Sequence, residues 1–159
     1  MTAFRFLMLL SLAVWLGALV FFPAVAQTAF ATLPPHSAGL VVRDSLLKLH
    51  WMAFVCGFVY LASSLFYNRL SLGGARSLSE SHMLIVVMLA LTAVSQFQII
   101  PRMDALRISA GEIASLPADS PMRAQFDSLH TWSTRLEETI LMLGLLLLYL
   151  TSRRLSSRV

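Results

Sequence analysis

The chain alternates between long apolar blocks and short polar segments. Three blocks contain no charged residue: residues 6–22, 52–66 and 83–97. A fourth block, residues 136–150, carries only Glu137 and Glu138 near its start. Each block with its flanks approaches the roughly 20 residues that a helix needs to cross a hydrocarbon core about 30 Å thick. The pattern therefore predicts an all-α fold with four membrane-spanning helices.

Proline, glycine and polar residues between the blocks predict where these helices end. We expect helices over residues 2–31, 38–67, 79–101 and 121–151, with a turn over residues 68–79 that contains Gly73 and Gly74. Residues 102–120 predict a short amphipathic helix between the third and fourth spans, closed by Pro117. The whole chain, residues 1–159, then forms one domain, a polytopic four-transmembrane-helix bundle.

Composition supports a membrane location and excludes several classes of function. Hydrophobic residues make up 57% of the chain and charged residues only 13%, against about 25% charged residues in soluble domains. The net charge of +4 is scattered, so we expect no nucleic-acid partner. Cys56 is the single cysteine, which excludes an intramolecular disulfide and leaves the redox compartment open. The lipid bilayer is the predicted partner, and a homo-oligomer or a second membrane protein is left open.

The first apolar block also has features of a signal peptide. Arg5 precedes it, and residues 24–26 fit a small-residue cleavage site. Its 17 uncharged residues, however, exceed the usual 7–15 residues of a signal peptide's apolar region. Small residues also fall on one face of the predicted helix, which favours close packing of membrane helices: Ala13, Gly17, Ala24, Thr28 and Ala31. We therefore expect this helix to be retained.

The acidic residues predict the orientation in the membrane. With four spans, both termini share one side, and lysine and arginine divide evenly at six on each side. Of the eight acidic residues only Glu80 lies on the side of the termini, so the arginines there are mostly unpaired. Unpaired basic residues beside span ends are typical of cytoplasmic segments. We predict cytoplasmic N- and C-termini.

Polar residues collect at the span ends on the side away from the termini. On the predicted fourth helix, His130, Ser133, Thr134, Glu137 and Leu141 have the spacing of one helical face. His50 on the second helix and Gln96 on the third lie on the same side of the membrane. A bundle can close these faces into a polar pocket whose candidate ligand-binding residues are His50, Gln96, Arg102, Arg107, His130 and Glu137.

The two histidines of this set allow three interpretations. His50 can hold helices together through a hydrogen bond to Gln96, or His50 and His130 on facing helices can bind haem iron, copper or zinc. In the third, the histidines simply lie at the membrane interface, where a polar side chain costs little. The pair lacks the local spacing of a metal motif, and the sequence identifies no cofactor. It also contains no phosphate-binding loop, nucleophile–base arrangement or paired-carboxylate site. We therefore predict a binding or accessory role rather than catalysis.

Several short motifs resemble a known family. In the first half these are Trp15-Leu16-Gly17, Phe21-Phe22, Leu33-Pro34 and Leu49-His50. In the second half they are the run from Pro101 to Arg107 and the run from Phe126 to His130. The chain resembles the transmembrane protein 205-like proteins, whose bacterial members carry domain of unknown function 4149. The resemblance implies four membrane helices, a retained first helix and the bacterial inner membrane, and it implies no activity, substrate or cofactor.

Three hypotheses of function follow. In the first, the pocket binds a small polar or anionic ligand, or a lipid head group, with Arg102 and Arg107 as anion partners. In the second, the protein is a haem- or copper-binding redox or metal protein that uses His50 and His130. In the third, it is a structural subunit of a larger membrane complex, and the small residues of the first helix face the partner.

Overall fold

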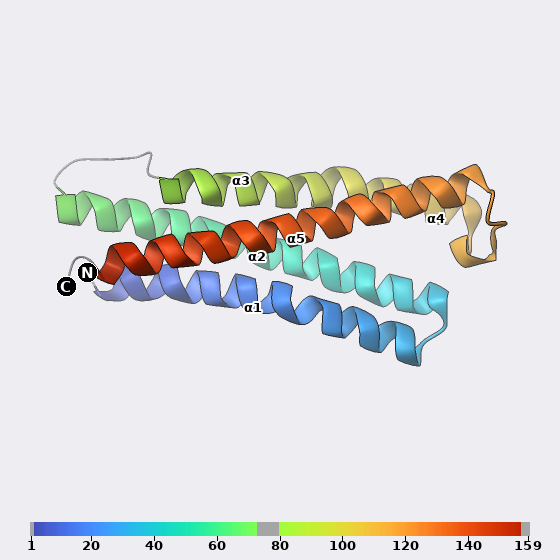
Figure 1. Cartoon of the computed structure of the whole chain (residues 1–159), viewed down its shortest axis with the longest axis horizontal. Helices are drawn as coiled ribbons and strands as arrows, with labels where there is room; N and C mark the ends of the chain where they lie inside the picture. Colours follow the sequence, from blue (N-terminus) through green and yellow to red (C-terminus); the bar gives the residue numbers. More distant parts are fainter. Residues whose placement is uncertain (1, 73–79, 157–159) are drawn as a thin grey trace.

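The structure is a computed structural model that describes residues 2–72 and 80–156, with side chains described for 2–70 and 80–154 (Figure 1). Its elements in chain order are α1 (Thr2–Thr32), α2 (Pro35–Leu72), α3 (Glu80–Val94), the π-helical segment η1 (Ser95–Ile99), α4 (Ile100–Ala110), the 3-10 turn η2 (Ile113–Ser115) and α5 (Pro121–Ser156). These ranges contain no strand, so the all-α prediction is confirmed for them. Helix α2 continues through residues 68–72, where the sequence predicts the start of the turn, and residues 73–79 of that turn lie outside the described residues.

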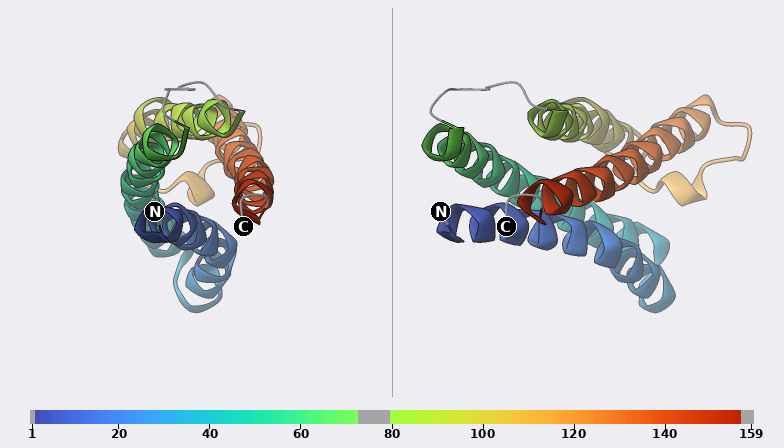
Figure 2. Two further views of the ribbon diagram at one scale, coloured as in Figure 1. Left: turned by 90° about the vertical axis from the view of Figure 1, so that its left-hand side faces the viewer. Right: turned by 60° about the vertical axis from the view of Figure 1, so that its left-hand side comes forward.

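The long helices pack in a ring. Helix α1 contacts α2, α2 contacts α3, α3 contacts α5, and α5 returns to α1, as the end view shows (Figure 2). The start of α1 and the end of α5 lie at the same end of the molecule (Figure 1). We call the opposite end the distal end. There α1 and the first half of α2 splay away from α4 and the first half of α5 (Figure 1).

Three helical stretches are long and apolar enough to cross a membrane by length and composition: Thr2–Thr32, Pro35–Leu70 and Glu80–Ala110. Large apolar side chains on these stretches are exposed, among them Phe21 at 66% and Phe58 at 64%. Outward-facing apolar surface of this kind suits lipid rather than water. The fourth predicted span, in α5, is not among the three. This helix has 36 residues, a length of about 54 Å, and its first half is polar.

Large apolar side chains fill the interior of the ring. The buried cluster includes Met8, Leu12, Trp15, Tyr60, Ile85, Met88, Ile140 and Leu147. The Tyr60 hydroxyl lies 2.7 Å from Thr151 Oγ1, which pairs two buried polar groups across α2 and α5. The core lies nearer the end of the molecule that holds the termini. Its buried α1 residues precede residue 20, and its buried α5 residues follow residue 139.

Two glycines allow the helices to approach closely. A Cβ atom added at Gly57 would lie 2.6 Å from Leu89 Cδ2, and one at Gly144 would collide with Leu16 and lie 3.1 Å from Met88 Cε. The small-residue face predicted on α1 does not have this role. All five of its residues are exposed, and a Cβ at Gly17 would meet no atom within 4 Å. Within this chain that packing prediction is wrong, because α1 turns its large apolar residues, not its small ones, toward the core.

The third span continues past the predicted end at Pro101. Helix α3 runs through η1 into α4 without a break, and the Ile100 amide donates to the Ser95 carbonyl five residues earlier. A widened π-type turn before the proline accommodates a residue that has no amide hydrogen and would crowd a regular turn. The predicted amphipathic helix over 102–120 is therefore not a separate element. Residues 102–110 extend the third helix, and Gly111 ends it at φ 70°.

Candidate functional site

A cavity of about 640 Å³ opens between the splayed helices at the distal end. We call it the distal cavity. Its walls come from the second half of α1, the first half of α2, α4, the segment around η2 and the first half of α5. Most of the lining is apolar, with Leu19, Phe22, Phe30, Leu46, Met103 and Phe126 among the larger side chains. The volume lies within the range of about 300–1,000 Å³ that is typical of small-molecule sites.

One face of α5 supplies the polar wall of the distal cavity. His130, Ser133, Thr134, Glu137 and Leu141 all line it, as their spacing in the sequence predicts. Ser133 is buried, whereas His130 and Thr134 are exposed. Glu137 lies roughly 20 Å farther along α5 than Arg123, another lining residue, because helices rise about 1.5 Å per residue. The carboxylate therefore sits toward the inner end of the cavity.

Three polar residues from three elements meet behind the inner end of the cavity. His50 of α2 is fully buried, with Nδ1 2.8 Å from Gln96 Oε1 and Nε2 2.8 Å from Glu137 Oε1. Ser95 Oγ also donates to Glu137 Oε1, at 3.3 Å. We call His50, Gln96 and Glu137 the buried triad. It joins α2, η1 and α5 at the level where the cavity meets the core.

The donors and acceptors of the triad constrain its protons. With Glu137 ionised, His50 Nε2–H donates to the carboxylate. If the Gln96 oxygen faces Nδ1, that nitrogen also donates and the ring is an imidazolium. If the amide is turned by 180°, its NH₂ group donates to Nδ1 and the ring is neutral. Both arrangements occupy both ring nitrogens of His50.

Glu137 has one oxygen inside the triad and one without a donor. Its Oε1 accepts from His50 and Ser95, while the buried Oε2 accepts no hydrogen bond from any described residue. The side chain as a whole is 14% exposed, and it lines the distal cavity. An ionised carboxylate offers about four acceptor sites. The buried Oε2 is therefore an acceptor without a donor, on a side chain that borders the cavity.

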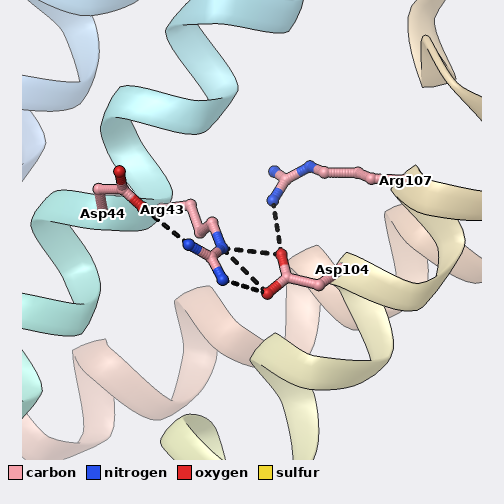
Figure 3. Close-up of polar contacts among 4 residues, drawn as sticks. All are labelled: Arg43, Asp44, Asp104 and Arg107. Carbon is pink, nitrogen blue, oxygen red and sulfur yellow. Dashed lines mark hydrogen bonds and ion pairs between the residues drawn. The ribbon is translucent and has the colours of Figure 1, made fainter.

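A second polar cluster ties α2 to α4 closer to the distal end (Figure 3). Arg43 Nε and Nη2 donate to the Asp104 carboxylate over distances of 2.6 to 2.9 Å, and Arg43 Nη1 contacts Asp44 at 2.7 Å. The side chain of Arg107 reaches Asp104 from the next turn of α4 at 3.4 Å. Its guanidinium also lies 5.1 Å from the centre of the Phe126 ring of α5. This fork-like pairing holds the α2 and α4 walls in register.

The structure separates the six candidate residues into three groups. His50, Gln96 and Glu137 form the buried triad, and Arg107 and His130 line the distal cavity farther out. Arg102 is exposed and is not among the lining residues. The widened turn of η1 explains its position. One additional residue rotates the following helix by about 100°, so Met103, not Arg102, follows Ser95 on the buried face.

Three residues that matter to the cavity are absent from the sequence-based set: Arg43, Asp104 and Phe126. Arg43 and Asp104 are 61 positions apart, and a pair between distant helices has no local spacing. The only sequence signal was the three-residue separation of Asp104 and Arg107, which places the two on one helical face. Phe126 belongs to one of the motifs that carry the family resemblance, but its contact with Arg107 has no sequence signature.

The donor geometry bears on the metal hypothesis. Within residues 2–72 and 80–156, no group of three or more histidine, cysteine, aspartate or glutamate side chains is placed to hold a metal ion. Both nitrogens of His50 face protein partners at 2.8 Å. The described side chains therefore provide hydrogen bonding and charge, not a preformed ligand set.

Fold and site together define an all-helical integral membrane protein with a ligand-sized cavity at one end of its bundle. A family model described as "Domain of unknown function (DUF4149)" matches residues 10–112, about two thirds of the sequence, and the chain belongs to that family. Comparison with curated proteins and with solved structures finds no match. The matched range contains His50, Gln96, Arg43 and Asp104 and ends before α5, so Glu137 lies outside it.

Proposed function

We propose that this protein binds a small amphipathic molecule in the distal cavity, at the boundary between membrane and water. The carrying observation is the cavity of about 640 Å³ itself, whose apolar walls surround a few convergent polar groups. Binding sites for small molecules have this composition, and the spaces between bundled helices are a usual place for them. The buried triad and the Arg43–Asp104 pair brace the walls against collapse.

The position of the cavity fits an amphipathic ligand. The apolar residues of α5 begin after Glu138, so in a four-span arrangement the inner end of the cavity lies where α5 enters the lipid. The outer part, around Arg107 and Arg123, then extends toward water. A molecule with an apolar body can enter from the lipid and present its polar group to the carboxylate. In this proposal α5 is the fourth span, the termini are cytoplasmic, and the distal end faces the other side of a bacterial inner membrane.

Filling the cavity should abolish binding. Ala26 of α1 lines the distal cavity and is half-buried, so Ala26→Trp places an indole in the ligand's space. We expect this variant to lose most of its affinity for a dodecyl probe in lipid nanodiscs, a change of at least tenfold, or about 1.4 kcal/mol. Ala31→Trp, an exposed position of the same helix outside the lining, is the matched control and should bind normally. Equal binding by both variants would place the ligand elsewhere.

Reporter fusions test the topology. Fusions at Leu72 and at the C-terminus should both report the cytoplasm, because both follow an even number of predicted spans. A fusion at Ala118, between η2 and α5, should report the opposite side, since it follows three spans. Opposite signals at Leu72 and the C-terminus would remove α5 as a span, whereas a cytoplasmic signal at Ala118 would contradict the predicted orientation.

A further inference from the structure

We infer that the polar group of the ligand is an amine with N–H donors, bound as an ammonium ion by the Glu137 carboxylate. This inference rests on the proposed function of the distal cavity and names the chemical class of its ligand. The carboxylate oxygen Oε2 is buried and accepts no hydrogen bond from the described residues. An acceptor in this state is unfavourable because it has lost water without gaining a donor, and more so when it is charged. A donor arriving with the ligand satisfies this acceptor.

The charges of the cavity wall favour a cation over an anion. The lining contains four carboxylates and three arginines: Glu112, Asp127, Glu137 and Glu138, against Arg43, Arg107 and Arg123. Each of the three arginines is already engaged by the protein. Arg43 is bound to Asp104 and Asp44, and Arg107 lies against Asp104 and the Phe126 ring. Arg123 donates to the Leu116 carbonyl at 3.1 Å.

The arrangement of hydrogen bonds at the Glu137 carboxylate favours a ligand that has an N–H donor, not only a positive charge. His50 and Ser95 both bind Oε1, so they hold the carboxylate in place and leave the buried Oε2 without a donor. A primary ammonium supplies three donors, whereas a quaternary ammonium supplies none. The apolar wall, with the Phe22 and Phe30 rings, fits the ligand's hydrocarbon body and tolerates a nearby cation. The ligand is therefore an amphipathic amine whose ammonium form carries an N–H donor.

Four probes of equal chain length separate donor, charge and apolar body: dodecylamine, dodecyltrimethylammonium, dodecanol and dodecanoate. Binding is measured to the full chain in phosphatidylcholine nanodiscs, with empty discs subtracted to remove partitioning into lipid. We expect dodecylamine to bind about tenfold more tightly than the other three, since a hydrogen bond to a charged group is stronger than one between neutral groups. Glu137→Gln should remove this preference. Glu80→Gln, which makes the same charge change at the far end of α3, should keep it.

The outcomes separate the inference from the proposed function. Retained dodecanol binding in Glu137→Gln shows that the variant is folded and its cavity intact. Preference for dodecanoate, or equal binding of dodecylamine and dodecyltrimethylammonium, would overturn the amine inference while leaving a binding cavity. Failure of all four probes to bind the wild type above the Ala26→Trp level would overturn the proposed function itself.

Adding phosphatidylethanolamine to the discs identifies the source of the amine. Competition with dodecylamine indicates a lipid headgroup, and the absence of competition indicates a free amine. Both results support an ammonium ligand.

Discussion

Replacing His50 with alanine is expected to lower the free energy of unfolding by about 3 kcal/mol, because it leaves a buried carboxylate without its main partner. His50 is fully buried and bonds α5 through Glu137 and η1 through Gln96. Alanine cannot replace either hydrogen bond, and it also leaves a space where the ring packs. Reversible unfolding in mixed micelles, followed by circular dichroism, measures the change.

Two further variants make this expectation specific. His130→Ala removes the same side chain from an exposed position, where a change within about 0.5 kcal/mol is usual. Adding Glu137→Gln to His50→Ala should recover part of the lost stability, since the amide carries no charge to leave unpaired. Equal unfolding of the His50 and His130 variants would show that the buried triad does not hold the helices together.

Gly144→Leu is expected to be the second most damaging substitution. A Cβ at this position of α5 would collide with Leu16 of α1 and approach Met88 of α3, so a leucine has room only if both of these side chains shift. Inserting atoms into a packed core costs about 1–3 kcal/mol, and we expect the upper part of that range. Thermal unfolding in detergent should show a clear loss of stability.

Gly17→Leu provides the matched control for this packing. It makes the same substitution on α1, where a Cβ meets no atom within 4 Å and the position is exposed. It should unfold like the wild type, or slightly later, because leucine favours a helix over glycine. A strongly destabilised Gly17→Leu would instead indicate that the exposed small-residue face of α1 packs against a partner chain.

The sequence predicts the helices well because lipid imposes a strong and simple pattern. Uncharged blocks of 15 or more residues specify three of the long apolar helices. The spacing of His130, Ser133, Thr134, Glu137 and Leu141 also places one wall of the cavity correctly, because α5 is a regular helix through that region. The pairing of His50 with Gln96 follows from two polar residues that enter neighbouring spans on one side.

What the sequence does not specify are irregular turns and pairings between distant helices. Pro101 predicts a helix end, yet the widened turn of η1 absorbs the proline and carries the helix on to Ala110. That turn also rotates Arg102 to the exposed side, which no regular periodicity anticipates. The contact of Arg43 with Asp104 depends on how α2 packs beside α4, and a local pattern contains no information about that packing.

Native mass spectrometry of the full chain, released from mild detergent, tests the central claim most directly. If the distal cavity is a binding site, the wild type should carry one additional small molecule that resists gentle activation, and Ala26→Trp should carry none while Ala31→Trp keeps it. The adduct, once released and fragmented, should contain an amine. A wild type without an adduct, or an adduct retained equally by wild type and Ala26→Trp, would contradict a ligand site in the distal cavity.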